Sequence, residues 1–361
     1  MNILRLTCLL LLLFSKSLYA QEKKEHKPKI VGAPVIAYLP ETSWQFGAGA
    51  KFLFNFKNDT IPTRTSFLAF TARYTLLHQI IFNPNYIIFT NGEKFLIKGE
   101  AGFTKFPNQY FGIGNNTPRS NKEEISFRQI TFDNIFYKKV KKDLFVGLGY
   151  RFINTYDLQS EKNGLLQKEE PPGYNGSIVS GLTAAITYDS RDNILNSTEG
   201  ELIEFIAGAH GNYLGGNYNF ISFLLDARKY ISPFPHRDDV VALQFYGMSS
   251  SSQTPFTSLA ALGGDRIMRG YYQGRFRDQN IMVVQAEYRL PVYGRFGMTF
   301  FGGLGDVAGQ VSDYAFSSIK PSYGAGLRFL VSKPDNLNIR FDYAFGRGGE
   351  SMFYLNIAEA F

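Results

Sequence analysis

The sequence is poor in the residues that build disulfides, metal sites and membrane helices. It has one cysteine, one tryptophan and four histidines in 361 residues. The cysteine is Cys8, inside a predicted leader, so the mature chain can form no disulfide and must be held by backbone pairing and burial. No later segment approaches about 18 uninterrupted apolar residues, which excludes a helical membrane protein. No cluster of His and Cys has the spacing of a metal site, so we expect neither a metal nor another cofactor.

Groupings typical of enzymes and nucleotide sites are missing too. Gly-x-Ser-x-Gly does not occur, and no serine neighbours a histidine in a recognisable catalytic arrangement. Glycine-rich segments such as FVGLGY precede no helix-forming stretch and no Gly-Lys-Ser/Thr, so they fit closely packed strands better than phosphate-binding loops. We therefore expect no enzyme, no catalytic residues and no nucleic-acid partner.

The N-terminus has the features of a secretory signal peptide. Arg5 precedes an apolar run over residues 6–14, and Ala20 is a small residue before a cleavage site. The run is too short to span a bilayer, and Cys8 lies at its start, which does not suit a lipidated cysteine. We expect a signal peptide over 1–20, a short charged periplasmic tail over 21–29 (QEKKEHKPK) and a single domain over 30–361.

Aromatic residues and glycine are abundant, with 34 Phe, 22 Tyr and 35 Gly. In LNIRFDYAFG, Phe341, Tyr343 and Phe345 alternate with polar or small residues, so one face can meet lipid and the other water. A water-soluble β-sandwich alternates as well, with its apolar faces meeting in a core. Export together with this composition favours an outer-membrane β-barrel.

About sixteen segments alternate in this way, which predicts an all-β fold, a transmembrane antiparallel β-barrel. An even count places both chain ends in the periplasm, with long external connections after odd-numbered strands and short turns after even-numbered ones. The connection lengths follow this rule. The expected strands lie near 30–40, 43–57, 64–76, 78–91, 94–106, 123–138, 142–155, 177–189, 200–211, 217–231, 238–248, 280–290, 297–307, 320–331, 337–345 and 351–360. The long connections are 107–122, 156–176, 249–279 and 308–319.

The longest connection contains the stretch GGDRIMRGYYQGRF. A barrel of about sixteen strands encloses a lumen wide enough for water unless something fills it. Glycines let the backbone turn tightly against the wall, and arginines can pair bidentately with lumenal carboxylates. We expect this extracellular loop to fold into the lumen; an external loop whose arginines meet lipopolysaccharide phosphates stays open as the alternative. The arginines concerned are Arg266, Arg269, Arg275 and Arg277.

Residues 180–361 resemble a known family in several motifs that fall in matching order. These are the glycine pair and Arg-Gly-aromatic triplet of the loop, the segment YDSRDNILNSTEG, the strands QAEYRLP and IRFDYAFG, and the final Phe361. Together they are similar to the BamA/TamA-type superfamily, the bacterial surface antigen family, whose barrels insert outer-membrane proteins or secrete partner proteins. The resemblance implies a lumenal loop motif (Gly263, Gly264, Arg269, Gly270, Tyr271), a mid-barrel turn motif (Asp189, Arg191, Asp192, Asn193, Gly200) and a C-terminal targeting strand (Phe353, Leu355, Ile357, Phe361).

The sequence departs from the family at the partner of the loop arginine. The family's Phe-x-Asp-x-Gly strand motif maps onto FGGLG (301–305), where a glycine replaces the carboxylate. Asp306 is near but has the opposite side-chain parity, which would point it away from the lumen. We expect Asp342, and after it Glu287, to hold Arg269, because both lie on polar faces of late strands.

Prolines mark the place where the barrel closes. The first expected strand, near 30–40, carries Pro34 and Pro40, and proline cannot donate to a β-ladder. We infer a weakly bonded seam between the first and last strands; the alternative, that these prolines shape an entry segment before a fully paired strand, is equally compatible with the sequence.

The resemblance implies a role in outer-membrane protein assembly, insertion or translocation. Residues 21–29 are too few for the periplasmic POTRA domains of that family, so we expect a POTRA-less barrel that works with a partner supplying them. The alternative is a passive pore or solute channel that the arginine-rich loop constricts. Expected surroundings are outer-membrane lipid and lipopolysaccharide, with other outer-membrane or periplasmic assembly proteins as partners.

Overall fold

A computed structural model describes residues 28–56, 63–194, 196–234, 237–332 and 336–361. The predicted signal peptide, and the predicted tail apart from Pro28 and Lys29, lie outside the described residues. Within the described ranges, no helix has the length and apolarity needed to cross a bilayer.

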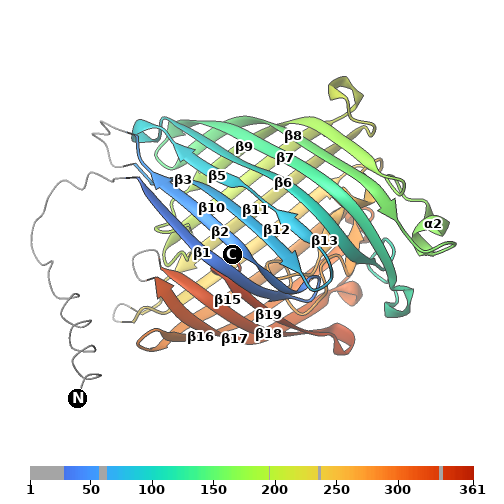
Figure 1. The fold of residues 1–361 in the computed structure, drawn as a ribbon. Coiled ribbons are helices and arrows are strands. Elements are labelled where there is room, and N and C mark those ends of the chain that lie inside the picture. Colours follow the sequence, from blue (N-terminus) through green and yellow to red (C-terminus); the bar gives the residue numbers. More distant parts are fainter. Residues whose placement is uncertain (1–27, 57–62, 195, 235–236, 333–335) are drawn as a thin grey trace, which may run out of the picture.

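The strands form one closed antiparallel barrel (Figure 1). β4 and β5 both pair with β3 and β6, so they are two parts of one barrel strand, interrupted where Pro84 cannot donate to the ladder. The 17 strands of the sheet therefore make sixteen barrel strands, which confirms the prediction from alternation. The sheet consists of β1 (Lys29–Leu39), β2 (Ser43–Phe54), β3 (Ser66–Thr75), β4 (Ile80–Phe82), β5 (Asn85–Phe89), β6 (Phe95–Tyr110), β7 (Glu123–Lys141), β8 (Leu144–Gln159), β9 (Ser177–Asp189), β10 (Gly200–His210), β11 (Phe220–Ile231), β12 (Val240–Ser250), β15 (Asn280–Tyr293), β16 (Phe296–Ala308), β17 (Lys320–Ser332), β18 (Leu337–Gly346) and β19 (Ser351–Ile357).

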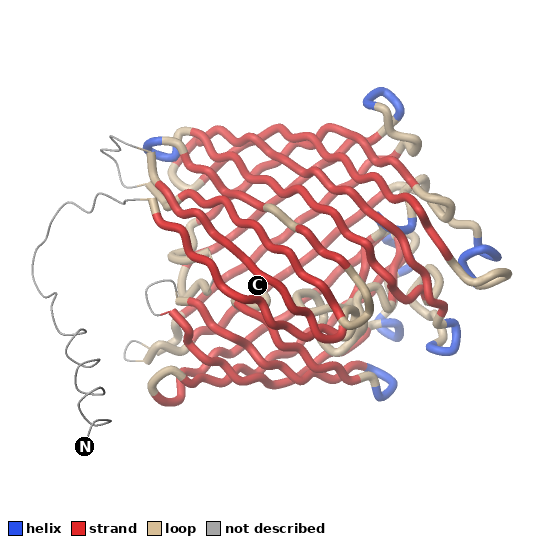
Figure 2. The backbone as a smooth tube through the Cα atoms, in the orientation of Figure 1, coloured by secondary structure: helices blue, strands red, loops and turns tan. Residues whose placement is uncertain are grey.

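The long connections gather at one end of the barrel, which we call the external end, and the opposite end is called periplasmic (Figure 2). This asymmetry is the one predicted, and it is typical of outer-membrane barrels. Among the residues that the structure describes, helical structure is limited to short turns in the connections. These are η1 (Asn91–Glu93), η2 (Arg119–Asn121), α2 (Leu165–Glu169), η3 (Asn212–Leu214), η4 (Phe256–Ser258), η5 (Val311–Asp313), η6 (Phe316–Ser318) and η7 (Arg347–Gly349).

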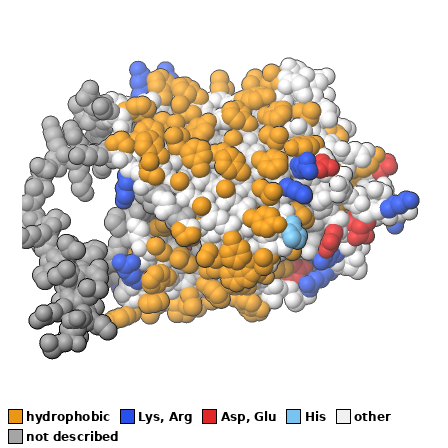
Figure 3. All heavy atoms as spheres, in the orientation of Figure 1, with side chains coloured by type: hydrophobic (Ala, Val, Ile, Leu, Met, Phe, Trp, Pro, Cys, Tyr) orange, Lys and Arg blue, Asp and Glu red, His pale blue; other side chains and the backbone are white. Residues whose placement is uncertain are grey.

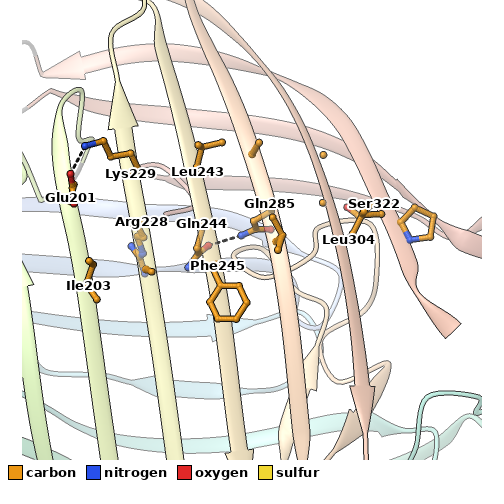
Figure 4. Close-up of a pocket in the computed structure, with 16 residues that line it drawn as sticks. Glu201, Ile203, Arg228, Lys229, Leu243, Gln244, Phe245, Gln285, Leu304 and Ser322 are labelled. Carbon is orange, nitrogen blue, oxygen red and sulfur yellow. Dashed lines mark hydrogen bonds and ion pairs between the residues drawn. The ribbon is translucent and has the colours of Figure 1, made fainter. Parts of the chain in front are cut away.

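The outer wall carries a belt of apolar side chains between two ends where charged residues gather (Figure 3). Along β18, Phe341, Tyr343 and Phe345 are exposed while Arg340 and Asp342 are buried, so the sequence alternation becomes a lipid face and a lumenal face. A hollow of about 690 Å³ interrupts the belt over β10–β12 and β15–β17. An ion pair between Lys229 and Glu201 lies at its edge (Figure 4).

The last strand is shorter than predicted, and the expected placement of Phe361 on it is wrong. β19 ends at Ile357, and Ala358 adopts a left-handed conformation with φ 68° that turns the chain away from the strand direction. Ala360 and Phe361 then bury themselves on the lumenal side of the wall, in a cluster with Tyr230, Val240 and Ala242. We call residues 358–361 the C-terminal tail.

Candidate functional site

The long connection between β12 and β15, residues 251–279, folds into the barrel and is called the plug. Its two ends approach each other in a small hairpin of β13 (Ala260–Leu262) and β14 (Phe276–Asp278). Apolar plug residues pack with lumenal residues of β15 and β16 in one core cluster. The cluster contains Ala260, Leu262, Met268, Tyr271 and Phe276 from the plug and Ile281, Val283 and Val307 from the wall.

Arg269 lies at the centre of the plug and is only 3% exposed. Its Nη1 donates to Oδ2 of Asp342 at 2.6 Å, and its Nη2 bonds to Oε1 of Glu287. The guanidinium also lies over the ring of Phe301, 3.5 Å from the ring centroid. A planar, permanently charged group with several fixed donors suits this position, because it satisfies two carboxylates and an aromatic face at once. We call Arg269, Glu287 and Asp342 the plug clamp.

The plug clamp belongs to a larger buried network of charges. Arg328 and Arg340 also bind Asp342, at 2.6 and 3.1 Å, and Arg289 binds Glu287 at 3.0 Å. The positive and negative charges are equal in number, and close pairing of opposite charges offsets part of the cost of burying them. The network comprises four arginines, Arg269, Arg289, Arg328 and Arg340, and four carboxylates, Asp265, Glu287, Asp342 and Glu359.

The neighbours of Arg269 in the loop motif fix its position. Gly270 has φ 106°, and its backbone N–H donates to the Tyr354 hydroxyl of β19 at 3.0 Å. Tyr271 donates its hydroxyl to the Pro321 carbonyl at 2.7 Å. Gly263 and Gly264 are also left-handed, with φ 112° and 105°. The glycine pair and the Arg-Gly-Tyr triplet therefore shape one turn that presents the guanidinium to the wall.

Gly303 stands where the family motif has a carboxylate, and its surroundings explain the exchange. A Cβ built there would lie 2.9 Å from Cβ of Gln285 in β15 and 3.0 Å from Sδ of Met268, so the neighbouring strand and the plug together occupy the space that a side chain would need. Asp306 does not pair with Arg269; it bonds Lys320 at 2.7 Å near the external end of β16. Asp306 is nevertheless buried, only 3% exposed, because Lys320 and Ser318 lie against its carboxylate.

The four loop arginines have different surroundings, and the expectation that all of them pair with lumenal carboxylates was wrong. Arg275 bonds Glu350 of the connection between β18 and β19 at 2.8 Å. Arg277 is buried beside the Tyr110 ring, and Arg266 is exposed. Among the described residues, neither Arg266 nor Arg277 has a carboxylate within ion-pair distance. Only Arg269 therefore serves the clamp.

The mid-barrel turn motif closes the periplasmic connection between β9 and β10. Arg191 forms a two-point ion pair with Asp189, at 2.8 and 3.0 Å. Asp192 accepts the backbone N–H of Thr198, and Gly200 has φ 94° where the chain enters β10. The Asn193 carbonyl accepts the Ser197 hydroxyl.

The same turn reaches the clamp network, a connection that the sequence did not suggest. Nη1 of Arg289 donates to Oδ1 of Asn196 and to the Ser197 carbonyl, each at 3.3 Å. The other side of Arg289 contacts Glu287 of the clamp. Alternation marks Arg289 as lumenal, but only the folded barrel shows that a periplasmic turn and an external loop share one arginine.

The seam between β1 and β19 is the weakest join in the described barrel. β1 pairs with β2 over eleven positions but with β19 at one, Tyr38 with Leu355. Pro34 lies in the part of β1 beyond the end of β19. Continued in the same register, residue 359 would stand opposite Pro34, but the chain has already turned inward at Ala358. The expectation that Pro40 belongs to the seam was wrong, because Pro40 lies after β1, in the external turn.

Glu41, in the external turn between β1 and β2, is buried against the plug. Its Oε1 accepts the backbone N–H of Gln273 at 2.6 Å. Burial raises the pKa of Glu41 from 4.5 to about 7; the hydrogen bond from Gln273 opposes this rise, and the nearby charge of Asp265 adds to it. With the plug seated, Glu41 therefore holds a proton that a solvated Glu41 would release.

Raising the pH from about 4.5 to about 7 is expected to loosen the plug. The seated form binds the Glu41 proton more tightly, so its extra stability is full below pH 4.5, falls as the pH rises towards about 7, and then levels off. The rate of transient openings in planar bilayers should rise over this range. Glu41→Gln, which stays neutral, should give a flat profile; an unchanged slope would assign the effect to another group.

Comparison with known proteins agrees with this architecture. The model of the Omp85 superfamily domain matches residues 129–361. Comparison with curated protein sequences finds no relative. Among solved structures, BamA from Haemophilus ducreyi lacking POTRA domains 1–3 has a TM-score of 0.61 at 13% identity, over 92% of this chain and 70% of that chain. CdiB from Acinetobacter baumannii has 0.57 at 10%, over 91% and 59%, and CdiB from Escherichia coli has 0.59 at 10%, over 93% and 68%.

At these identities the similarity to the solved structures concerns the fold alone. The chain spans between 59% and 70% of the length of those three chains. The match to the family model shows membership as well as fold, because it covers more than half of this chain and includes the whole plug, the clamp and the mid-barrel turn. The chain therefore belongs to the Omp85 superfamily and folds as an outer-membrane β-barrel.

Proposed function

We propose that this barrel takes part in the assembly, insertion or translocation of other proteins at the outer membrane, through its seam. The observation that carries the proposal is the single pairing of β1 with β19. Most of the β1 edge that faces β19 has backbone donors and acceptors without a ladder partner among the described residues. Such an edge is a template for pairing with another strand.

The C-terminal tail supports the same proposal. Glu359 is held on the lumenal side by Arg328 at 2.8 Å, and the main-chain oxygen of Phe361 accepts Nη2 of Arg289 at 2.7 Å. These contacts keep the chain after Ile357 away from β1. An incoming strand could pair with the free edge of β1 without first breaking a full ladder.

A passive pore is less well supported. The plug buries its apolar residues against the wall and fixes Arg269 between two carboxylates. A steady conductance of the unaltered protein in planar bilayers would favour the pore, whereas a closed barrel with rare openings favours the assembly role.

A disulfide across the seam tests the proposal. Tyr38→Cys with Leu355→Cys places two cysteines at directly paired positions, within the Cα separation that a disulfide spans. Cells that contain only this variant should lose other outer-membrane barrels or secreted clients under oxidising conditions and regain them after reduction, as measured by quantitative proteomics of outer membranes and medium.

The control is a disulfide within a complete ladder. Val284→Cys with Leu304→Cys joins β15 and β16 at paired, outward-facing positions. This pair should leave the client proteins at their normal levels in both redox states. Undiminished client levels with a fully oxidised seam pair would contradict a function that depends on seam opening.

A further inference from the structure

A polar pocket at the external end belongs neither to the plug clamp nor to the seam. It has a volume of about 590 Å³ and lies between the plug and three external connections. Arg275 and Phe276 of the plug form one side, with η2, η6 and η7 around them. The other lining residues are Asn115, Asn116, Thr117, Arg119, Ser317, Ser318, Lys320, Arg347, Gly348 and Glu350.

Positive charge exceeds negative charge in the lining. Four cations, Arg119, Arg275, Lys320 and Arg347, stand against one carboxylate, Glu350, for a net charge of +3. Adding Asp306, which lies behind Lys320, reduces the excess to +2.

Arg275 and Lys320 already form ion pairs within the fold, whereas Arg119 and Arg347 have donors available for a ligand. Arg275 is buried and held by Glu350 and by Thr117. Arg119 and Arg347 are exposed, and among the described residues neither has a carboxylate within ion-pair distance. Arg347 donates from Nη1 to the Ser317 carbonyl at 3.1 Å, which directs its guanidinium along the pocket wall. The free donors therefore come from two different connections that face one cavity.

We propose that this pocket binds a phosphate group carried on a saccharide, as presented by the outer leaflet or by the external medium. A phosphate offers three strong acceptor oxygens, and arginine donors meet it in a fixed fork. The neutral side chains of Asn115 and Asn116 add donors and acceptors suited to sugar hydroxyls. The volume lies within the usual range for small-ligand sites, roughly 300–1,000 Å³. A pocket of this size is too small for a folded protein.

Binding here would join the plug to the external connections. Arg275 is fixed to Thr117 and Glu350, so a phosphate shared by Arg119 and Arg347 closes the ring of contacts over β14. The ligand would thus hold the plug from outside, on a different face from the clamp. This inference does not depend on opening of the seam.

Calorimetric titration of the purified full chain in detergent tests the proposal. The probes are a bisphosphorylated glucosamine disaccharide without acyl chains, its dephosphorylated form, inorganic phosphate and a hexaglutamate peptide. We expect the bisphosphorylated disaccharide to bind and the dephosphorylated form not to bind. Arg119→Gln and Arg347→Gln should each weaken binding about tenfold, the loss of roughly one charge-assisted contact, and the double variant should abolish it.

Lys142→Gln is the matched control. Lys142 is an exposed cation in the periplasmic turn between β7 and β8, so its removal changes the net charge equally but not at the pocket. Equal affinity for inorganic phosphate would overturn the saccharide part of the proposal and leave a site for free phosphate. Unchanged binding in the double variant, equal binding of the dephosphorylated sugar, or equally tight hexaglutamate binding would overturn the proposal.

Discussion

Arg269→Ala is expected to lower the free energy of unfolding by about 3–5 kcal/mol, the usual cost of removing one partner from a buried ion pair. The substitution leaves Glu287 and Asp342 buried with fewer counter-charges and opens the space above Phe301. Asp342 keeps two arginines and Glu287 keeps one, so we expect a weakened barrel and a mobile plug rather than complete unfolding.

Three measurements check this. They are the denaturant midpoint in detergent, the sample temperature at which the band of the folded barrel disappears on a gel, and the conductance in planar bilayers. Arg266→Ala is the control, because it removes an exposed arginine of the same loop. Arg269→Lys should fall between the two, since one ammonium cannot reproduce both bonds and the stacking on Phe301. Wild-type stability and conductance in Arg269→Ala would contradict the clamp.

Gly270→Ala is expected to unseat the plug although it adds only one methyl group. Gly270 has φ 106°, which costs a residue with a side chain about 1–2 kcal/mol. The added Cβ would also lie 2.7 Å from the backbone carbonyl of Phe345 in β18, and a barrel strand cannot move aside. Both costs fall on the turn that presents Arg269, so openings in planar bilayers should become frequent.

Gly264→Ala separates these two costs. Gly264 has nearly the same backbone, with φ 105°, but its added Cβ would meet only the flexible side chain of Gln273 at 3.4 Å. This variant should lose stability through the backbone alone and keep the plug seated. Equal conductance in the two variants would show that contact with β18 does not matter.

Side-chain parity explains why much of the fold could be predicted. Alternation fixes which residues face the lumen, and loop lengths fix which end is external, so the sixteen strands and the lumenal position of Glu287 and Asp342 follow from local pattern. The structure brings both carboxylates to Arg269.

Features that depend on contacts between distant segments could not be predicted. Arg328 and Arg289 from other strands hold the chain after the inward turn at Ala358, whereas alternation alone predicts a strand near 351–360. The burial of Asp306 depends on Lys320 of the next strand. The external pocket is formed by four separate connections, none of which carries a recognisable phosphate-binding motif.

The shared arginines of the lumenal network link the two ends of the molecule. Arg328 bonds both Asp342 and Glu359, and Arg289 bonds both Glu287 and the main-chain oxygen of Phe361. Glu287 and Asp342, which bind Arg269 of the plug, are thus each bound by an arginine that also holds the C-terminal tail. By thermodynamic reciprocity, the factor by which withdrawal of the plug eases withdrawal of the C-terminal tail equals the factor by which withdrawal of the tail eases withdrawal of the plug. Release of the plug at the external end and release of the tail at the periplasmic end would therefore be two coupled equilibria.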